Sequence, residues 1–332
     1  MRAIVVREFG GPEVLRLEEV PDPVPGAGQL LVRVAAAGVQ FIETQTRTGS
    51  LQGVSPVAPK SLPWIPGREV AGSVLAVGEG VDADWVGRRT AGLTTAVGSG
   101  GGYASLALVE TGSAQQIPDT LGFAEAVSLL GTGRTALGLV ELAGVGEGDT
   151  VLIESAAGAV GLLSAQLARA AGAAHVIGLA RGAEKLALVK EFGADAAIDY
   201  AQDDWPEQVR AAAPDGVTVV FDGNGGAVGE LAFDLLADGG RFVIFGFSSG
   251  SMTQLDPELV AARSISLLSY FGPATGSRGP EVQARQTRDV IAAAAQGRLR
   301  PFVGQRFPLD QAPAAHTAIT ARATVGKTVL EP

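Results

Sequence analysis

The sequence predicts an α/β protein that combines a doubly wound parallel sheet with a second, β-rich domain. The length of 332 residues suits two domains better than one. From Met1 to about Gly122, short apolar runs are separated by Pro and Gly, whereas beyond about Phe123 apolar runs alternate with helical segments. Hydrophobic residues make up 46% of the chain and charged residues 18%, so the chain can bury two sizeable cores.

The β-rich domain is expected to comprise residues 1–124 and 270–332. Its short Val-, Leu- and Ile-rich runs predict strands and few helices in the first part. A helix is expected over residues 281–296, and the closing strand-like run, VGKTVL, can return to the sheet of this domain. The expected strands of the first part are Ala3–Val6, Gln29–Ala36, Val70–Val77 and Ser105–Val109.

Residues 125–269 are expected to form the parallel sheet. Near-continuous apolar runs are typical of parallel strands that are covered on both faces, and segments with helical periodicity lie between them. This alternation predicts successive β-α-β units and therefore a doubly wound sheet. The expected strands are Val151–Ser155, His175–Ala180, Ala196–Asp199, Val217–Asp222 and Arg241–Phe245, and the expected helices cover residues 161–171, 184–192 and 229–236.

The first of these units carries a turn of small residues, AAGAVG, between a buried strand and a helix. A dinucleotide pyrophosphate needs backbone N–H groups at a helix N-terminus and no side chains in its way, which is the pattern of the Rossmann fold. Gly158 would permit close contact and Gly161 tight packing of the helix. An ordinary Ala/Gly-rich turn is the alternative, because Ala156 stands where the first glycine of the motif is expected. The residues predicted to bind the cofactor here are Ala157, Gly158, Ala159, Val160 and Gly161.

The second strand of the unit ends at Ala180 and is followed by Arg181. An NAD-specific protein usually places Asp or Glu there to bind the ribose hydroxyl groups. Arg181, with Lys185 one turn into the next helix, offers two cations to a 2′-phosphate instead, so we expect NADPH as the cofactor. The alternative is that both cations belong to a solvated helix start, beside Glu184.

Composition and charge exclude several classes of function. A net charge of −10 disfavours binding to nucleic acid or to an anionic membrane. The absence of Cys removes thiolate chemistry, and two His residues leave little for a metal site, so we expect no metal. No signal peptide and no run of about 18–20 apolar residues is present, which suggests a cytoplasmic protein.

Several motifs together resemble the zinc-free medium-chain dehydrogenases/reductases, in particular their NADPH:quinone oxidoreductase-like branch. These motifs are FGGPEVLRLEEVPDPVPGAGQLLVRVAAAGV, FIETQTRTG, IPGREVAGSVLAVGEGV, AAGAVG, FGADAAIDY, DGNGGAVGELAFDLLADGGRFVIFG and VGKTVL. The resemblance implies a chaperonin-10-like fold for the β-rich catalytic domain. Gln40 and Arg68 stand where zinc-dependent relatives have a Cys and a His as metal ligands. Quinone oxidoreductases typically have Asn at the position of Gln40 and often Tyr at that of Gln45, so the pocket is expected to differ in shape.

The resemblance adds further cofactor positions. Tyr200 and Arg322 match residues beside the adenosine phosphate, although a packed tyrosine at a strand end and a surface arginine are the alternatives. Ligands of such sheets bind beyond the carboxyl ends of the strands, which places the residues after RFVIF near the nicotinamide. The full set of added positions is Thr135, Tyr200, Asn224, Gly246, Phe247, Ser248 and Arg322.

The expected reaction is hydride transfer from NADPH to a quinone or an α,β-unsaturated carbonyl compound, with water as the proton source. Candidate contacts to the substrate carbonyl are Gln40, Gln45, Arg47 and Tyr103, and the pocket is expected on the loops 48–62 and 94–102. The alternatives are an enoyl reductase of a biosynthetic pathway and a low-turnover NADPH-binding sensor or structural protein. A homodimer is expected by resemblance, with residues 264–272 as its apolar edge strand.

Overall fold

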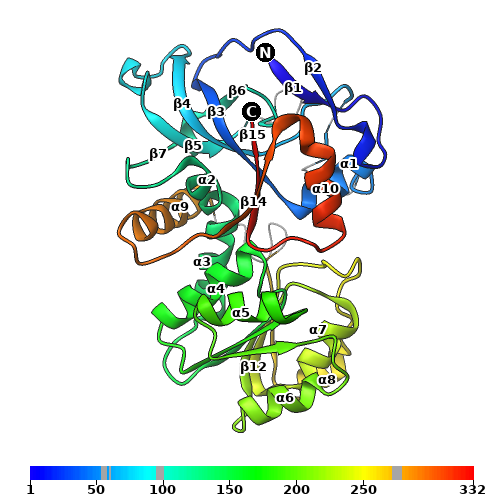
Figure 1. The fold of residues 1–332 in the computed structure, drawn as a ribbon. Helices are drawn as coiled ribbons and strands as arrows, with labels where there is room; N and C mark the ends of the chain where they lie inside the picture. The colour runs from blue at the N-terminus through cyan, green and yellow to red at the C-terminus, as the bar shows by residue number, and fades with distance from the viewer. Residues whose placement is uncertain (54–57, 60, 95–100, 271–278) are drawn as a thin grey trace. The chain divides into compact units, whose positions relative to one another are not determined.

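The computed structural model describes residues 1–332 except 54–57, 60, 95–100 and 271–278, and these residues form two compact units (Figure 1). Unit 1 consists of Met1–Gly131 and Thr287–Pro332, and unit 2 of Thr132–Gln286. Both chain termini therefore belong to unit 1. The predicted boundaries after residues 124 and 269 remain a prediction.

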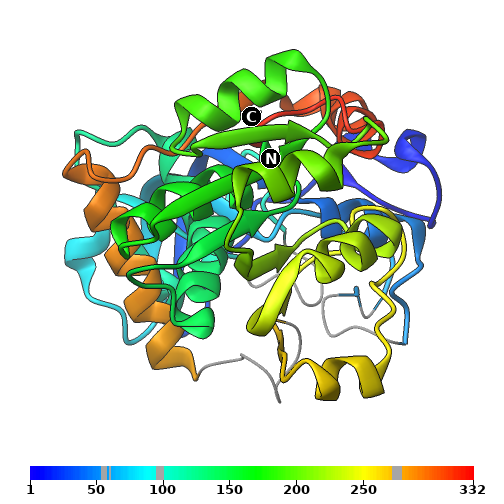
Figure 2. The same ribbon diagram turned by 90° about the horizontal axis from the view of Figure 1, so that it is seen from below.

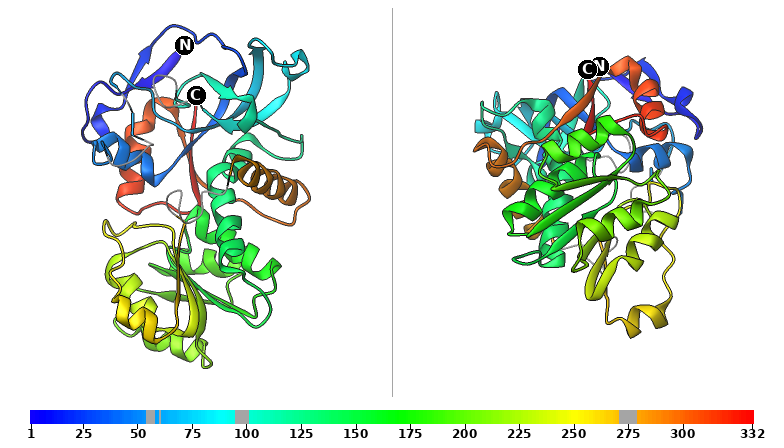
Figure 3. Two further views of the ribbon diagram at one scale, coloured as in Figure 1. Left: turned by 180° about the vertical axis from the view of Figure 1, so that it is seen from behind. Right: turned by 60° about the horizontal axis from the view of Figure 1, so that its bottom comes forward.

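Unit 1 is built around a seven-stranded sheet in the order β14-β15-β3-β4-β5-β7, with β6 paired to β3. Leu30, Val32 and Val34 of β3 are buried and alternate with more exposed residues, as expected for a strand with one face on the core. The closing strand β15 runs antiparallel to β3, with Val329 opposite Gly38, which confirms that the C-terminus returns to this sheet (Figure 3). The strands are β1 (Arg2–Val5), β2 (Arg16–Glu19), β3 (Gln29–Val39), β4 (Glu69–Val77), β5 (Arg89–Leu93), β6 (Leu106–Glu110), β7 (Gln115–Gln116), β14 (Val303–Pro308) and β15 (Lys327–Glu331).

Three helices pack in unit 1: α1 (Phe41–Thr48), α2 (Phe123–Val127) and α10 (Ala312–Thr320). α1 ends at Gly49, whose φ of 81° lies in the left-handed region that glycine adopts without strain. The sequence did not predict α1, because FIETQTRT is short and mostly polar. α9 (Pro280–Ala295) lies close to the predicted range and spans the boundary between the two units.

Unit 2 contains a six-stranded, wholly parallel sheet in the order β10-β9-β8-β11-β12-β13, which confirms the predicted doubly wound fold. From β8 the chain winds outward through β9 to β10, and from β11 it winds in the opposite direction. The order therefore reverses between β8 and β11, and this pair of strands is the topological switch point. The strands are β8 (Thr150–Ile153), β9 (His175–Ala180), β10 (Ala196–Asp199), β11 (Val217–Asp222), β12 (Leu236–Ile244) and β13 (Ser266–Ser269).

Helices cover both faces of this sheet (Figure 2). Right-handed crossovers in opposite directions place α4 and α5 on one face and α7 and α8 on the other. Phe233 and Phe242 meet edge to face with ring centroids 5.8 Å apart in the core under α7. The helices are α3 (Arg134–Ala143), α4 (Ala159–Ala170), α5 (Ala183–Glu191), α6 (Trp205–Ala212), α7 (Gly226–Asp234) and α8 (Pro257–Ala262).

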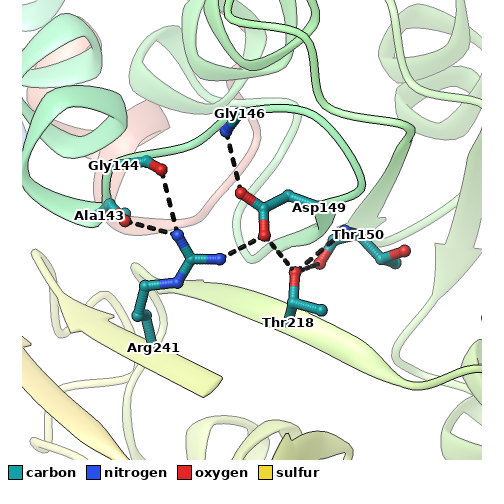
Figure 4. A network of polar contacts seen from close by, with 7 residues as sticks. All are labelled: Ala143, Gly144, Gly146, Asp149, Thr150, Thr218 and Arg241. Carbon is teal, nitrogen blue, oxygen red and sulfur yellow. Dashed lines mark hydrogen bonds and ion pairs between the residues drawn. The ribbon is translucent and has the colours of Figure 1, made fainter. Parts of the chain in front are cut away.

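At the amino ends of the central strands, a polar network joins β8, β11 and β12 (Figure 4). Asp149 accepts hydrogen bonds from Gly146 N at 2.9 Å and from Thr218 Oγ1 at 2.8 Å, and it pairs with Arg241. Arg241 also donates to the carbonyl oxygen of Ala143 at 2.8 Å. Burial alone would raise the pKa of Asp149, but these hydrogen bonds and the Arg241 charge hold it below its usual value. The network fixes the strands at the end opposite to the switch-point loops.

Candidate functional site

The small-residue turn lies at the carboxyl end of β8, directly at the switch point of the sheet. Gly158 is the N-cap residue of α4, and no side chain caps this helix. The first-turn N–H groups of Ala159, Val160 and Gly161 have no partner within the helix, because intrahelical bonds begin four residues in. Together with the positive end of the helix dipole, they can receive an anionic phosphate group.

Gly161 brings α4 against the turn. A Cβ atom at Gly161 would lie 2.5 Å from Ala156 Cα, so only glycine permits this packing. Ala156 itself is anchored by its N–H, which donates to the Leu179 carbonyl at the end of β9. Ala157 is buried beside it. The turn and the helix start are therefore held rigidly at the carboxyl ends of β8 and β9.

The end of β9 presents a cation to solvent. Arg181 is exposed, and its guanidinium carbon lies 5.7 Å from the centre of the Tyr200 ring. Asp199 Oδ2 accepts a hydrogen bond of 2.9 Å from Gly182 N, which orders the loop that carries Arg181. Lys185 is half-buried on α5. The fold thus brings Arg181 and Tyr200 together, as the predicted phosphate site requires.

A closed ring of polar contacts joins three loops at the carboxyl edge of the sheet. Ser155 and Ser248 hydroxyl groups lie 3.2 Å apart, and Ser248 Oγ donates to Asn224 Oδ1 at 3.1 Å. Asn224 N donates to Glu154 Oε2 at 2.9 Å, and Glu154 precedes Ser155 in the chain. Ser155 has a φ of 51°, the left-handed region, so the turn departs sharply from β8. The loops after β8, β11 and β12 therefore hold one another in place.

Glu154 of this ring also pairs with Asp222, so that two buried carboxyl groups meet at the ends of β8 and β11, and both residues are 0% exposed. Burial raises the pKa of Glu154 well above its usual value, and the charge and hydrogen bond of Asp222 raise it further. Asp222 accepts from Gly225 N at 2.8 Å and from the Thr253 hydroxyl. The sequence analysis missed this pair, although a Glu at the end of an apolar strand run was a visible signal.

The remaining predicted cofactor residues are distributed over both units. Thr135 is half-buried on α3, and Gly246 and Phe247 follow β12. A Cβ atom at Gly246 would lie 2.5 Å from the Gly223 carbonyl oxygen, so the loops after β11 and β12 run in close contact. Arg322 belongs to unit 1, where it is exposed in a turn after α10 with a φ of 55°.

In unit 1, the polar residues expected to contact the substrate cluster at α1. Gln40 precedes the helix and is partly exposed, and its amide hydrogen-bonds to Glu69. Gln45 is also partly exposed, and its side chain contacts Thr44 and Ser50 at 3.4 Å each. Both residues are therefore partly exposed, Gln40 directly before α1 and Gln45 on it. The predicted pocket loops, 48–62 and 94–102, lie partly outside the described residues.

Tyr103 does not fit the expected role of a substrate contact. It is 0% exposed, and its hydroxyl donates to Glu43 Oε2 at 2.7 Å and lies 3.1 Å from His316 Nε2. Glu43 also accepts from the backbone N–H groups of Gln40 and Arg68, at 2.9 and 3.0 Å. The Tyr103 hydroxyl is buried and already has two polar neighbours, Glu43 and His316. Through Glu43, Tyr103 supports the start of α1.

Arg47 belongs to the same buried cluster. It is 3% exposed, and its Nε and Nη1 atoms have no hydrogen-bond partner in the described part of the chain. Burial lowers the pKa of Arg47, and the charge of Arg47 adds to burial in lowering the pKa of His316 to about 3. His316 is therefore neutral at physiological pH. Because the Arg47 side chain is buried, Arg47, like Tyr103, is a poor candidate for direct contact with substrate.

A buried ion pair supports Gln40 from the other side. Lys327 Nζ lies 2.9 Å from Glu69 Oε2, and the side chains are 3% and 1% exposed. Glu69 Oε1 accepts a hydrogen bond of 2.7 Å from Gly131 N. The sequence analysis missed Glu69, Lys327, Glu43 and His316, because only their burial marks them. These residues join β4, β15 and α1 into one polar core.

In the part of the chain that the structure describes, no helix is long and apolar enough to cross a membrane. The same residues contain no group of three or more His, Cys, Asp or Glu side chains that could hold a metal ion. Gln40 and Arg68 are not ligands that zinc prefers, and Arg carries a repelling charge. The residues at this position therefore do not fit zinc.

Comparisons with known proteins agree with this architecture. Residues 26–119 match the alcohol dehydrogenase GroES-like domain, and residues 159–286 match the family of zinc-binding dehydrogenases. The quinone oxidoreductases of Rattus norvegicus and Pseudomonas aeruginosa are 33% and 34% identical to the chain. The alignments cover 99% and 98% of this chain and 97% of each relative.

Solved structures show the same similarity. The Escherichia coli quinone oxidoreductase complexed with NADPH matches with a TM-score of 0.88 and 29% identity over 100% of both chains. A mycobacterial protein complexed with NADPH matches with a TM-score of 0.86 and 35% identity, again over 100% of both chains. The chain therefore belongs to the quinone oxidoreductase branch of the medium-chain dehydrogenase/reductase superfamily.

Proposed function

We propose that the protein is an NADPH-dependent, metal-independent oxidoreductase that transfers hydride to a quinone or to an α,β-unsaturated carbonyl compound. The observation that carries this proposal is the uncapped N-terminus of α4 at the switch point, with Arg181 at the end of the neighbouring strand. The NADPH complexes of the Escherichia coli and mycobacterial relatives support the choice of cofactor.

In this proposal the N–H groups of Ala159, Val160 and Gly161 bind the pyrophosphate, and Ala157 and Gly158 leave room for it. Arg181 binds the 2′-phosphate through charge-assisted hydrogen bonds, with Lys185 and Arg322 as further cations. Ala180 and Tyr200 flank the adenosine. The loops that carry Thr135, Asn224 and Gly246–Ser248 orient the nicotinamide, whose hydride is the reductant that the bound cofactor supplies.

For the substrate, we propose that Gln40 and Gln45 donate amide hydrogen bonds to the carbonyl oxygen, where negative charge accumulates as hydride arrives. Glu69 and Lys327 hold the amide of Gln40, and Tyr103 and Glu43 hold the start of α1. Arg47 contributes through the same buried cluster and not by direct contact. Water remains the expected proton source.

The alternatives share much of this evidence. An enoyl reductase of a biosynthetic pathway would use the same cofactor site, and an NADPH-binding sensor would use it without turnover.

A homodimer is also proposed: β13 is an edge strand of its sheet, and Leu267 on it is 47% exposed.

An activity screen tests the proposed function. The purified protein is mixed with NADPH or NADH and with a panel of quinones, enones and enoyl thioesters, while the absorbance of the reduced nicotinamide is followed. We expect consumption of NADPH with quinones or enones and much slower consumption of NADH. Turnover with enoyl thioesters alone would favour the enoyl reductase, and tight binding of NADPH without turnover would favour the sensor.

A further inference from the structure

The buried pair of Glu154 and Asp222 has no role in the proposed hydride transfer, yet it lies at the switch point where the cofactor is proposed to bind. An inference about it therefore rests on the proposed function. Two carboxyl groups at 0% exposure are costly, because a charged carboxylate loses its hydration on burial. This free-energy cost suggests that the pair of carboxyl groups stabilises the loops that follow β8 and β11.

Hydrogen bonding defines where a proton resides in the pair. Both oxygens of Asp222 accept hydrogen bonds, from Gly225 N and from the Thr253 hydroxyl. Glu154 Oε2 accepts from Asn224 N, whereas Glu154 Oε1 is buried and has no hydrogen-bond partner among the described residues. The Asp222 carboxyl group interacts with the Glu154 carboxyl group and raises its pKa. A proton on Glu154 Oε1 makes this atom a donor to Asp222 and satisfies both groups. The neutral Glu154 therefore bridges the ends of β8 and β11.

The bridge controls the loops that the cofactor needs. Glu154 is followed directly by Ser155 and the small-residue turn, and Asp222 is followed by the Gly223–Gly226 loop that leads into α7. The polar ring of Glu154, Ser155, Ser248 and Asn224 connects these loops. Loss of the shared proton places two negative charges side by side, and their repulsion separates the loops after β8 and β11.

We propose that Glu154 is a positioning residue for the nicotinamide cofactor: in its neutral form it donates a hydrogen bond to Asp222 and holds the two switch-point loops in the arrangement that binds NADPH. The protein therefore loses affinity for NADPH as the pH rises through the raised pKa of Glu154, while the rest of the fold persists.

The titratable group that faces Glu154 is Asp222, from the end of β11. The backbone N–H groups of Asn224 and Gly225 also donate to Glu154 and lower its pKa, against the effects of burial and Asp222. Uncharged Ser155, Ser248 and Thr253 complete the surroundings from β8, from the loop after β12 and from the segment before α8.

The test is the dissociation constant of NADPH as a function of pH, from about pH 7 to about pH 10, where the 2′-phosphate, whose second pKa is about 6, stays ionised. Wild type, Glu154→Gln and Glu230→Gln are compared. The amide of Gln at position 154 can donate to Asp222 and accept from Asn224 N but cannot ionise. Glu230 is an exposed residue of α7, so Glu230→Gln is a matched control for loss of one carboxylate. Circular dichroism at each pH identifies the range in which each protein is folded.

For wild type and Glu230→Gln, we expect the dissociation constant to rise with pH. Above the pKa of Glu154 the rise approaches about tenfold per pH unit, because the fraction of protein with a neutral Glu154 falls tenfold. For Glu154→Gln we expect a smaller slope, whatever its absolute affinity. Any loss of NADPH affinity at high pH that comes from Lys185 or other cations is the same in all three proteins, so it cancels when their pH profiles are compared. Parallel profiles for wild type and Glu154→Gln, with both proteins folded, would overturn the inference.

A second measurement covers the case in which Glu154→Gln does not fold. If binding selects the protonated pair, wild type must take up as much as one proton with NADPH at alkaline pH. Calorimetric titrations in two buffers with different ionisation enthalpies measure this uptake. No uptake at any pH overturns the inference and leaves the proposed function intact, whereas failure of NADPH to bind at every pH overturns both.

Discussion

The buried ion pair between Lys327 and Glu69 gives the sharpest stability prediction. Both side chains are nearly inaccessible, at 3% and 1% exposure, with 2.9 Å between Nζ and Oε2. Burial alone would raise the pKa of Glu69, but the Lys327 charge and the hydrogen bonds from Lys327, Gln40 and Gly131 hold it below its usual value. Lys327→Met removes the cation and leaves a buried carboxylate unpaired, which typically costs about 3–5 kcal/mol.

For a domain of 150–250 residues, each kcal/mol shifts the Tm by about 2–4 °C, so Lys327→Met should lower the Tm of unit 1 by about 6–20 °C. Thermal unfolding followed by near-UV circular dichroism measures this shift. Lys190→Met, at an exposed lysine of α5, is the matched control and should change the Tm little. The double variant Glu69→Gln/Lys327→Met keeps an acceptor for Gly131 N and should recover at least half of the loss. A loss below about 1 kcal/mol in Lys327→Met would refute the reasoning.

Three further predictions concern the cofactor site and the Tyr103 cluster. Arg181→Asp should weaken NADPH binding about 10–150-fold more than NADH binding, the equivalent of a charged hydrogen bond of about 1.5–3 kcal/mol, and equal losses in titrations would contradict the phosphate contact. Tyr103→Phe should lower the free energy of unfolding by about 1–3 kcal/mol, because it removes a buried hydrogen-bond donor to Glu43, and denaturant unfolding measures this loss. A fall in turnover with unchanged stability would instead support Tyr103 as a substrate contact. His316 has a pKa of about 3 in the folded state, below its unfolded value, so protonation favours unfolding. Stability should therefore fall by about 1.6 kcal/mol between pH 6.5 and pH 5, and a pH-stability profile of His316→Gln that keeps this slope would be contrary evidence.

Strands with continuous apolar character were predicted most accurately from the sequence. β9, β10 and β11 have the predicted bounds, because parallel strands buried on both faces read as near-continuous apolar runs. β12 begins at Leu236, five residues earlier than predicted, since LADGG reads as a turn. Only Leu236 of this segment pairs with β11, opposite Val217, and the register shifts before Arg241. α1 was missed, because a short polar helix whose contacts lie in tertiary structure has no clear periodicity.

The candidate site was predictable to a similar degree. The Ala/Gly turn and Arg181 follow strands, and strand ends meet at one edge of a parallel sheet, so sequence order alone places them together. Sequence order does not show whether a polar side chain is buried. Tyr103 was interpreted as a substrate contact because a polar tip in a loop looks accessible, yet it is enclosed with Glu43 and His316. Glu154 and Asp222 were missed because carboxylates are usually exposed, and only the structure shows them paired.

The small-residue turn as the pyrophosphate site is the central claim, and a charge at Gly158 tests it most directly. Gly158 has φ −76° and ψ 166°, which any residue adopts, and a Cβ atom there would lie 3.2 Å from the Ser155 carbonyl oxygen. Asp and Asn are both good N-cap residues of the same size, so Gly158→Asp and Gly158→Asn should fold alike and differ in charge. Calorimetric titration should show NADPH bound at least about tenfold more weakly by Gly158→Asp than by Gly158→Asn, the equivalent of about 1.4 kcal/mol. Equal affinities for the two variants would contradict the account.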